Sequence, residues 1–236
     1  MKNSQILDIR YYQKLPKDIS DYYHIFNSHN IQHFEALKRY LVKTRFVKGD
    51  ILEFRVDRGK SLIIICYLIK ELKLNKEFIA MDSFLGFDFI SSKDSSYKKT
   101  KVGEWSCSPN QNLKYNKTFI QKILKKHIYK NNFKKPDLIK GYVGLKLSKL
   151  IKKIKKISFI NLDLDLYSGH KNVLSYCWDK LSVNGMIYFD DIIPSLRNAP
   201  FPGALLAYKE FFKNNKKQIK EYICPQRKNL IVKKIK

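Results

Sequence analysis

The chain has 236 residues, of which 44% are hydrophobic and 14% aromatic, and it carries a formal net charge of +26 at pH 7. This composition excludes a disordered chain, and the length suffices for one large domain with a sizeable core. No run approaches the roughly 18 apolar residues of a membrane span, and the N-terminus lacks the apolar stretch of a signal peptide. We therefore expect a cytoplasmic protein without a membrane span.

The positive charge comes mainly from lysine, because only seven of the 47 basic residues are arginine. Specific nucleic-acid recognition tends to use the planar guanidinium, so this excess argues against a nucleic-acid partner and favours a compositional bias. Attraction to a polyanion or peripheral association with an anionic membrane stays open. The four cysteines, Cys66, Cys107, Cys177 and Cys224, form no CxxC pair, which predicts reduced thiols.

Hydrophobic periodicity predicts a helical lead-in or cap over residues 1–47 and one alternating domain over residues 48–236. The expected elements are, in chain order, helical segments within Ile19–Val47, strand Asp50–Phe54, helix Ser61–Leu72, strand Phe78–Met81, helix Thr118–Ile128, strand Pro136–Ile139, helix Leu145–Lys156, strand Ile157–Leu162, helix Lys171–Leu181, strand Met186–Phe189, helix Phe201–Lys213 and a hairpin around Pro225–Arg227. Asn184-Gly185 predicts a turn before the strand that starts at Met186. Alternating strands and helices predict a parallel sheet covered on both faces, and the hairpin predicts an antiparallel edge.

Two of the expected strands end in paired carboxylates. The run ISFINLDLDLY presents Asp163 and Asp165, and the run GMIYFDD presents Asp190 and Asp191. Open α/β sheets bind ligands at the carboxyl ends of their strands. The pattern therefore predicts a site for a divalent cation or a polar ligand, although these acids would equally cap the helices that follow.

The turn after the first strand, in GDILEFRVDRGKS, has features of a nucleotide site. Gly59 and Ser61 stand at the start of a helix, whose N-terminal amides and dipole suit a ligand. Glu53 and Asp82 end two successive strands, where the second acid of a βαβ unit receives ribose hydroxyls. This signal is weak alone because no GxGxxG is present.

Six segments, the one just described among them, occur in a fixed order across residues 49–212: GDILEFRVDRGKS, MDSFLGF, KGYVGLKL, INLDLDLYSGHKNVL, LSVNGMIYFDDI and FPGALLAYKEFF. Together they resemble the macrocin O-methyltransferase (TylF/MycF-like) family of class I enzymes that use S-adenosylmethionine (SAM). The resemblance implies a Rossmann-like methyltransferase fold, with a mostly parallel seven-stranded sheet and a C-terminal antiparallel hairpin, over residues 48–236. It also implies Mg²⁺-assisted methyl transfer to a hydroxyl of a sugar or glycosylated small molecule.

The resemblance assigns roles to individual residues. Asp163, Asp190 and Asp191 would bind Mg²⁺, and Asp165 would be a further ligand or a support of the ligands. Asp163 and His170 are the catalytic candidates, His170 because an imidazole titrates near neutrality, although a surface or helix-cap role for His170 is open. The residues implied in SAM binding are Glu53, Asp57, Gly59, Ser61, Asp82, Ser83, Gly141 and Tyr142.

Two positions depart from the family pattern. Arg55 and Lys60 stand where the family has glycine, which lets the backbone approach the ligand closely. Arg55 must therefore swing away, pair with Glu53 or the SAM carboxylate, or narrow the pocket. This departure motivates one alternative, a catalytically impaired binding module with this fold, and the charge motivates another, a nucleic-acid-directed methyltransferase. The sequence leaves a homo-oligomer open.

Overall fold

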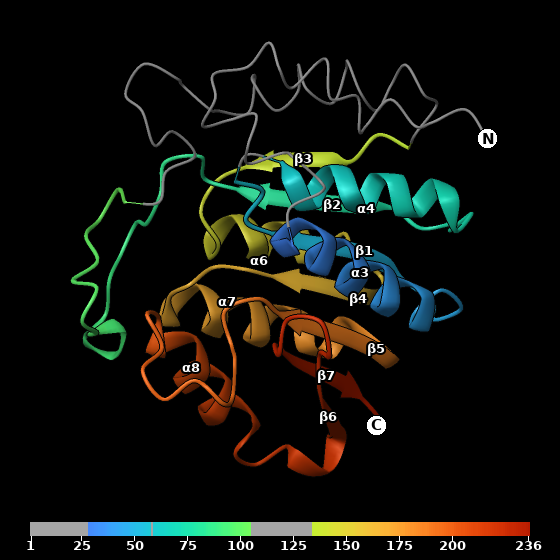
Figure 1. Cartoon of the computed structure of the whole chain (residues 1–236). Coiled ribbons are helices and arrows are strands. Elements are labelled where there is room, and N and C mark those ends of the chain that lie inside the picture. The colour runs from blue at the N-terminus through green and yellow to red at the C-terminus, as the bar shows by residue number, and fades with distance from the viewer. Residues whose placement is uncertain (1–27, 58, 105–133) are drawn as a thin grey trace.

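The computed structural model describes residues 28–57, 59–104 and 134–236 of the chain and contains one seven-stranded sheet (Figure 1). The strand order is β3-β2-β1-β4-β5-β7-β6, with β7 antiparallel to both of its neighbours and the other pairs parallel. The strands are β1 (Asp50–Phe54), β2 (Phe78–Asp82), β3 (Asp137–Lys140), β4 (Ile157–Leu162), β5 (Leu181–Phe189), β6 (Ile219–Ile223) and β7 (Leu230–Lys234). This order confirms the class I methyltransferase fold with its C-terminal antiparallel hairpin.

Helices cover both faces of the sheet and pack against it in two separate hydrophobic clusters. The α-helices in the described residues are α3 (Ser28–Lys43), α4 (Lys60–Glu71), α6 (Leu145–Ile151), α7 (Tyr167–Cys177) and α8 (Pro202–Phe212). One cluster joins α3 and α4 to the sheet, and the other joins α6, α7 and α8 to it. The central strand β4 is buried at all six positions, as its continuous apolar run predicts.

The predicted turn at Asn184-Gly185 is a bulge inside β5 and does not precede the strand. Ile157 of β4 pairs with Leu181 of β5, and Phe159 pairs with Met186, so a step of two residues faces a step of five. Asn184 has a φ of 68°, a left-handed conformation that asparagine tolerates. The predicted turn therefore lies at the predicted residues, but β5 pairs with β4 both before and after it.

Helix α7 begins at Tyr167 and not at Lys171, because a side chain from another segment caps it. Asp94, in the short helical turn η2 (Ser92–Asp94), accepts a hydrogen bond from the Tyr167 N–H at 2.7 Å. An acceptor at this place satisfies an amide that the first helical turn leaves free. Helix α6 ends at Ile151, so residues 152–156, which the sequence pattern placed in this helix, lie beyond it.

The N-terminal part of the chain shares the main core as far as it is described. Ala36, Leu37, Tyr40 and Leu41 of α3 are buried in the cluster that also contains α4. The division at residues 47 and 48 stays a prediction, since residues 1–27 lie outside the description, as does the expected helix Thr118–Ile128. Among the described helices, none combines the length and the hydropathy that crossing a bilayer requires.

The cap of α7 yields a stability prediction at Gly203, in the first turn of α8. A Cβ atom at Gly203 would lie 1.9 Å from Asp94 Oδ1 and 2.7 Å from the Tyr167 nitrogen. We expect Gly203→Ala to lower the free energy of unfolding by roughly 1–3 kcal/mol, because overpacking forces this junction apart. Urea denaturation measures the change. Leu206→Ala, at an exposed position of the same helix, is the control, and equal losses in the two variants would contradict the close packing.

Candidate active site

The predicted acids meet because backbone hydrogen bonds continue past the ends of three adjacent strands. The Asp163 N–H donates to Phe54 O at the end of β1 at 3.2 Å, and the Asp190 N–H donates to Leu162 O at the end of β4 at 2.9 Å. The chain directions of β1, β4 and β5 are the same, so all three strands deliver their last residues to one edge. The local pairing thus fixes where the acids lie.

Three carboxylates form one compact cluster at this edge. Asp163, Asp165 and Asp191 each offer an oxygen that lies within 4.8 Å of the others. Asp165 has a φ of 59° and is the central residue of a tight turn in which the Leu166 N–H donates to Leu164 O at 2.6 Å. Its own N–H donates to Asp191 Oδ2 at 2.7 Å, which ties the two acids together.

Arg55 reaches into this cluster from the end of β1. Its Nη1 donates to Asp163 Oδ1 at 3.1 Å and also forms an ion pair with Asp165 Oδ2. The exposed fractions of the side chains are 15% for Arg55, 27% for Asp163 and 5% for Asp165. The guanidinium therefore pairs with two of the clustered acids, a partner set that differs from those the sequence suggested for it.

Carboxylate oxygens are ligands that Mg²⁺ prefers, but the ion pairs of these carboxylates with Arg55 oppose its binding. Octahedral Mg²⁺ with bonds of about 2.1 Å would place opposite oxygens about 4.2 Å apart, close to the spacing of the cluster. Arg55, however, already contacts two of its three carboxylates. A divalent cation fits these oxygens only after the guanidinium has moved away.

Asp190, a predicted metal ligand, has a different partner. Arg227, in the loop between β6 and β7, holds it through two parallel contacts, Nη1 to Oδ1 and Nη2 to Oδ2, the second at 3.3 Å. Asp165 takes the place of Asp190 in the carboxylate cluster. The predicted set of Asp163, Asp190 and Asp191 therefore differs from the cluster that the structure brings together, because Asp190 is turned toward the hairpin.

His170 is not placed to act as a general base. Its side chain has no exposed surface, Nδ1 lies 2.9 Å from Leu166 O, and Nε2 lies 3.4 Å from Asp191 Oδ2. Burial lowers the pKa of His170 to about 4, so the imidazole is neutral at pH 7. The ring stacks on Phe189, and its Nε2 has no hydrogen-bond partner among the described residues.

Burial and mutual repulsion raise the pKa values of the clustered acids. Burial is the largest cause for Asp163, whose pKa rises to about 7 although Arg55 acts in the opposite sense. Burial and the neighbouring acids raise the pKa of Asp191 well above its usual range. Burial also opposes the charged form of Arg55, but Asp165 and Asp163 outweigh it and keep the pKa of Arg55 well above its usual value. The buried acids therefore hold protons more readily than exposed carboxyl groups do, even with the guanidinium in place.

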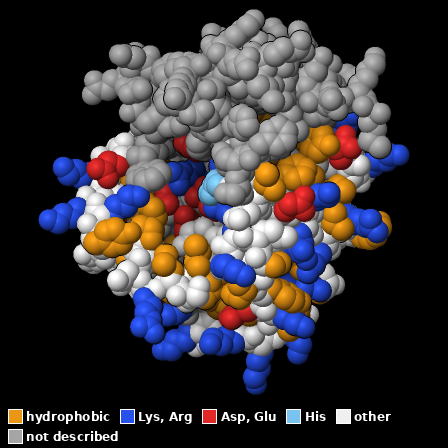
Figure 2. All heavy atoms as spheres, in the orientation of Figure 1, with side chains coloured by type: hydrophobic (Ala, Val, Ile, Leu, Met, Phe, Trp, Pro, Cys, Tyr) orange, Lys and Arg blue, Asp and Glu red, His pale blue; other side chains and the backbone are white. Residues whose placement is uncertain are grey.

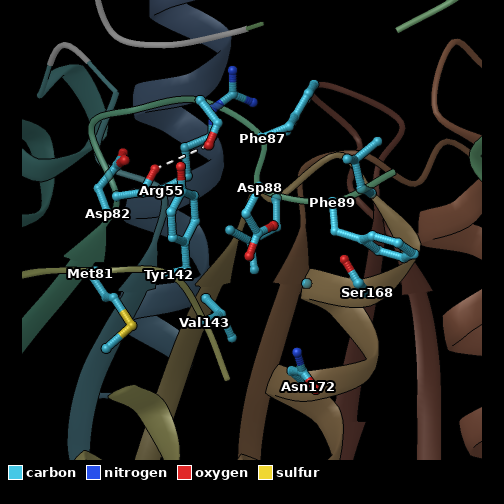
Figure 3. Close-up of a pocket in the computed structure, with 16 residues that line it drawn as sticks. Arg55, Met81, Asp82, Phe87, Asp88, Phe89, Tyr142, Val143, Ser168 and Asn172 are labelled. Carbon is cyan, nitrogen blue, oxygen red and sulfur yellow. Dashed lines mark hydrogen bonds between the residues drawn. The ribbon is translucent and has the colours of Figure 1, made fainter. Parts of the chain in front are cut away.

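A cavity of about 300 Å³ opens at the ends of β1 and β2 (Figure 3). Four of the residues predicted to bind SAM line it: Asp82, Ser83, Gly141 and Tyr142. Figure 3 shows Asp82, Met81 and Tyr142 together on one side and Phe89 and Ser168 on the other. A mixed polar and aromatic wall of this kind suits a nucleoside.

Asp82 also joins the two turns of this cavity. Its Oδ2 accepts hydrogen bonds from the N–H groups of Val56 and Asp57 at 2.7 and 2.8 Å, and Oδ1 accepts one from Phe84 N–H at 2.7 Å. A carboxylate has about four acceptor positions, so a ribose hydroxyl still finds one. Asp82 therefore shapes the turn after β1 as well as facing the cavity.

A second cavity of about 250 Å³ contains the acids and lies beside the first. Two of the predicted SAM residues, Asp57 and Ser61, line it, together with Asp163, Asp165, Asp190 and Asp191. Figure 2 shows acidic, basic and histidine side chains gathered in a recess of the visible face. Arg55 lines both cavities, so it forms the wall between them. Gly59, with a φ of 88°, is the N-terminal cap of α4 beside this wall.

Glu53 is predicted to bind SAM, but its carboxyl group lies beneath the cavities. The side chain is fully buried, Oε1 accepts a hydrogen bond from Asn161 Nδ2 at 3.2 Å, and Oε2 has no partner among the described residues. Burial raises the pKa of Glu53 to about 8. It is therefore a neutral carboxylic acid at pH 7. Glu53 of β1 lies opposite Asn161 of β4 in the parallel pairing of the two strands.

Several residues of the site were missed by sequence reasoning. Phe87, Asp88 and Phe89 come from the long connection after β2, and Asn172 comes from α7, whose start was placed too late. Arg227 was part of the hairpin signal but received no role. Because arginine is scarce in this chain, an arginine in the hairpin was a signal of a specific role that the sequence already contained.

Comparisons with known proteins agree with this geometry. A family model described as macrocin-O-methyltransferase (TylF) matches residues 21–221. Among curated proteins, no sequence is significantly similar to the chain.

Solved structures share the fold at low sequence identity. CalS11, described as a calicheamicin methyltransferase, has a TM-score of 0.73 and 17% identity over 96% of this chain and 90% of its own. The O-methyltransferase NovP has a TM-score of 0.72 and 16% identity over 98% and 96%. The SAH-bound methyltransferase PaMTH1 of Podospora anserina has a TM-score of 0.56 and 15% identity over 100% and 89%.

The buried carboxylic acid gives a pH prediction. The pKa of Glu53 is about 8 in the folded state against 4.5 for an exposed glutamate, so between these values the folded state keeps a proton that the unfolded state has released. The free energy of unfolding should therefore fall as pH rises from about 4.5 to about 8. Glu53→Gln, which is neutral throughout, should flatten this fall and be more stable than wild type at pH 8 by more than about 1 kcal/mol.

Urea denaturation at pH 5, 7 and 9 measures this effect. Glu71→Gln, at the exposed end of α4, is the matched control and should keep the wild-type slope. An unchanged slope in Glu53→Gln would show that Glu53 is ionised in the folded protein.

Proposed function

Because the chain belongs to the macrocin O-methyltransferase (TylF) family, we propose that it transfers a methyl group from SAM to a hydroxyl of a sugar or a glycosylated small molecule. It is a SAM-dependent O-methyltransferase of class I fold, and the sugar acceptor is the proposed part. The observation that carries the proposal is the pair of adjoining cavities, one suited to a nucleoside and one lined by carboxylates.

The second cavity has the chemistry of a polyhydroxylated acceptor site. Its lining combines acceptor groups such as Asp163 and Asp57 with donors such as Lys60 and Ser61, which suits neighbouring hydroxyls. CalS11, which shares the fold, is described as a TDP-rhamnose 3′-O-methyltransferase. A nucleotide sugar is therefore the first acceptor to test. Since SAM is an intracellular metabolite, we also place the activity in the cytoplasm.

Asp163 is the residue that we assign to the proton. It is more exposed than Asp165, the other acid that Arg55 contacts, and it lines the second cavity beside Arg55. SAM supplies an electrophilic methyl group on a sulfonium sulfur. The acceptor hydroxyl gives its proton to Asp163 and its oxygen forms the new C–O bond, while the electron pair of the broken C–S bond stays on sulfur. Alignment of the oxygen with the methyl carbon is the main task of the cavity walls.

Magnesium assistance is a further part of the sequence prediction. Arg55 and Arg227 hold two of the three predicted ligands, Asp163 and Asp190, so the residues as arranged do not fit a divalent ion. The transfer through Asp163 does not require one. Mg²⁺ assistance therefore stays a prediction of the family resemblance.

The activity itself is tested by incubating the full chain with methyl-labelled SAM and a panel of nucleotide sugars and glycosides, with duplex DNA and RNA as control acceptors. We expect label on a sugar-containing compound and none on nucleic acid, because the second cavity, of about 250 Å³, has the size and polar lining of a small-molecule site. Label on RNA alone would support the nucleic-acid alternative. SAM binding without transfer to any acceptor would support the binding module.

The role of Asp163 has its own test once an acceptor is known. Asp163→Asn keeps the shape but not the basicity, so we expect kcat to fall by about 10²–10⁴-fold while the Kd for SAM changes little. Asp179→Asn, at an exposed position after α7, is the control and should behave like wild type. A kcat within threefold of wild type in Asp163→Asn would remove Asp163 from the proton transfer.

A further inference from the structure

Arg55 has a backbone conformation that favours glycine, yet it carries a long charged side chain. Its φ is 77°, in the left-handed region that few non-glycine residues adopt. Its N–H donates to Met81 O at 2.9 Å, so this conformation is fixed by the pairing of β1 with β2. The backbone thus holds the residue at the point where β1, β2 and β4 open into the site.

The Arg55 side chain stands where a cation is needed. The guanidinium contacts Asp163 and Asp165, and the remaining acids have their own partners: Asp190 pairs with Arg227, and Asp191 accepts the Asp165 N–H. A divalent ion bound to the same oxygens would lie within a few ångströms of the guanidinium. Two cations so close in a poorly solvated site repel each other strongly.

We propose that Arg55 is the resident cation of this site and takes the place of a divalent metal ion. It neutralises Asp163 and Asp165, fixes their direction beside the acceptor cavity, and allows methyl transfer without a metal. The inference rests on the proposed function for its catalytic part. Its cation-binding part concerns Arg55 and the acids alone and can be measured without any acceptor.

The test measures binding of Mn²⁺, a spectroscopic substitute for Mg²⁺, by the electron paramagnetic resonance signal of the free ion. Wild type, Arg55→Gly, Arg55→Lys and the control Arg45→Gly are compared as full chains at one ionic strength. Glycine suits the positive φ, so the variant should fold, which thermal unfolding verifies. Arg45 is exposed and stacks on Phe46, and it is not among the residues that line the acid-containing cavity.

We expect no saturable Mn²⁺ binding below millimolar concentration in wild type or Arg45→Gly, and at least tenfold tighter binding in Arg55→Gly. Arg55→Lys keeps one positive charge and should stay close to wild type. Equal Mn²⁺ affinity in wild type and Arg55→Gly, whether tight or undetectable, would overturn the proposal. Tight binding by wild type that excess Mg²⁺ displaces would do so as well.

With an acceptor in hand, a chelator separates the two proteins further. Wild type should keep its full rate in excess EDTA, whereas Arg55→Gly should lose its rate in EDTA and regain it with Mg²⁺. A wild-type rate that EDTA abolishes would overturn the inference and restore the metal-assisted mechanism. A wild type inactive toward every acceptor would instead count against the proposed function, and the Mn²⁺ result would still decide the role of Arg55.

Discussion

Two backbone hydrogen bonds, from Asp163 N–H to Phe54 O and from Asp190 N–H to Leu162 O, determine the whole site. They extend the parallel pairing of β1, β4 and β5 by one residue beyond the strands proper. The four acids Asp163, Asp165, Asp190 and Asp191 of the second cavity take their place from this edge. A shift of one residue in either pairing would turn the acids to the other face of the sheet, because side chains alternate along a strand.

This edge concentrates carboxylates in a poorly solvated place, and two arginines form ion pairs with them. Arg55 sits one residue beyond β1, and Arg227 arrives from the hairpin between β6 and β7. Burial still raises the pKa values of Asp163 and Asp191, so these two acids hold a proton more readily than exposed carboxyl groups do.

The sequence predicted the sheet well because its information is local. Short, largely apolar runs identify β2 and β4, and the acids at their ends follow directly from chain order. It failed where a distant segment decides the local structure. Asp94 moves the start of α7 forward to Tyr167, and Arg227 draws Asp190 away from the carboxylate cluster. His170 was misjudged for the same reason, since burial is a property of the packed α7 and not of the residue.

The use of arginine against the bias of the composition argues that Arg55 and Arg227 have specific roles. In a chain with seven arginines among 47 basic residues, two arginines form ion pairs with the acids of one cavity. Lysine carries the same charge but lacks the planar fork that meets a carboxylate through two nitrogens, as Arg227 meets Asp190. At Asp190 the geometry of the donor matters, and there the chain has the guanidinium of Arg227.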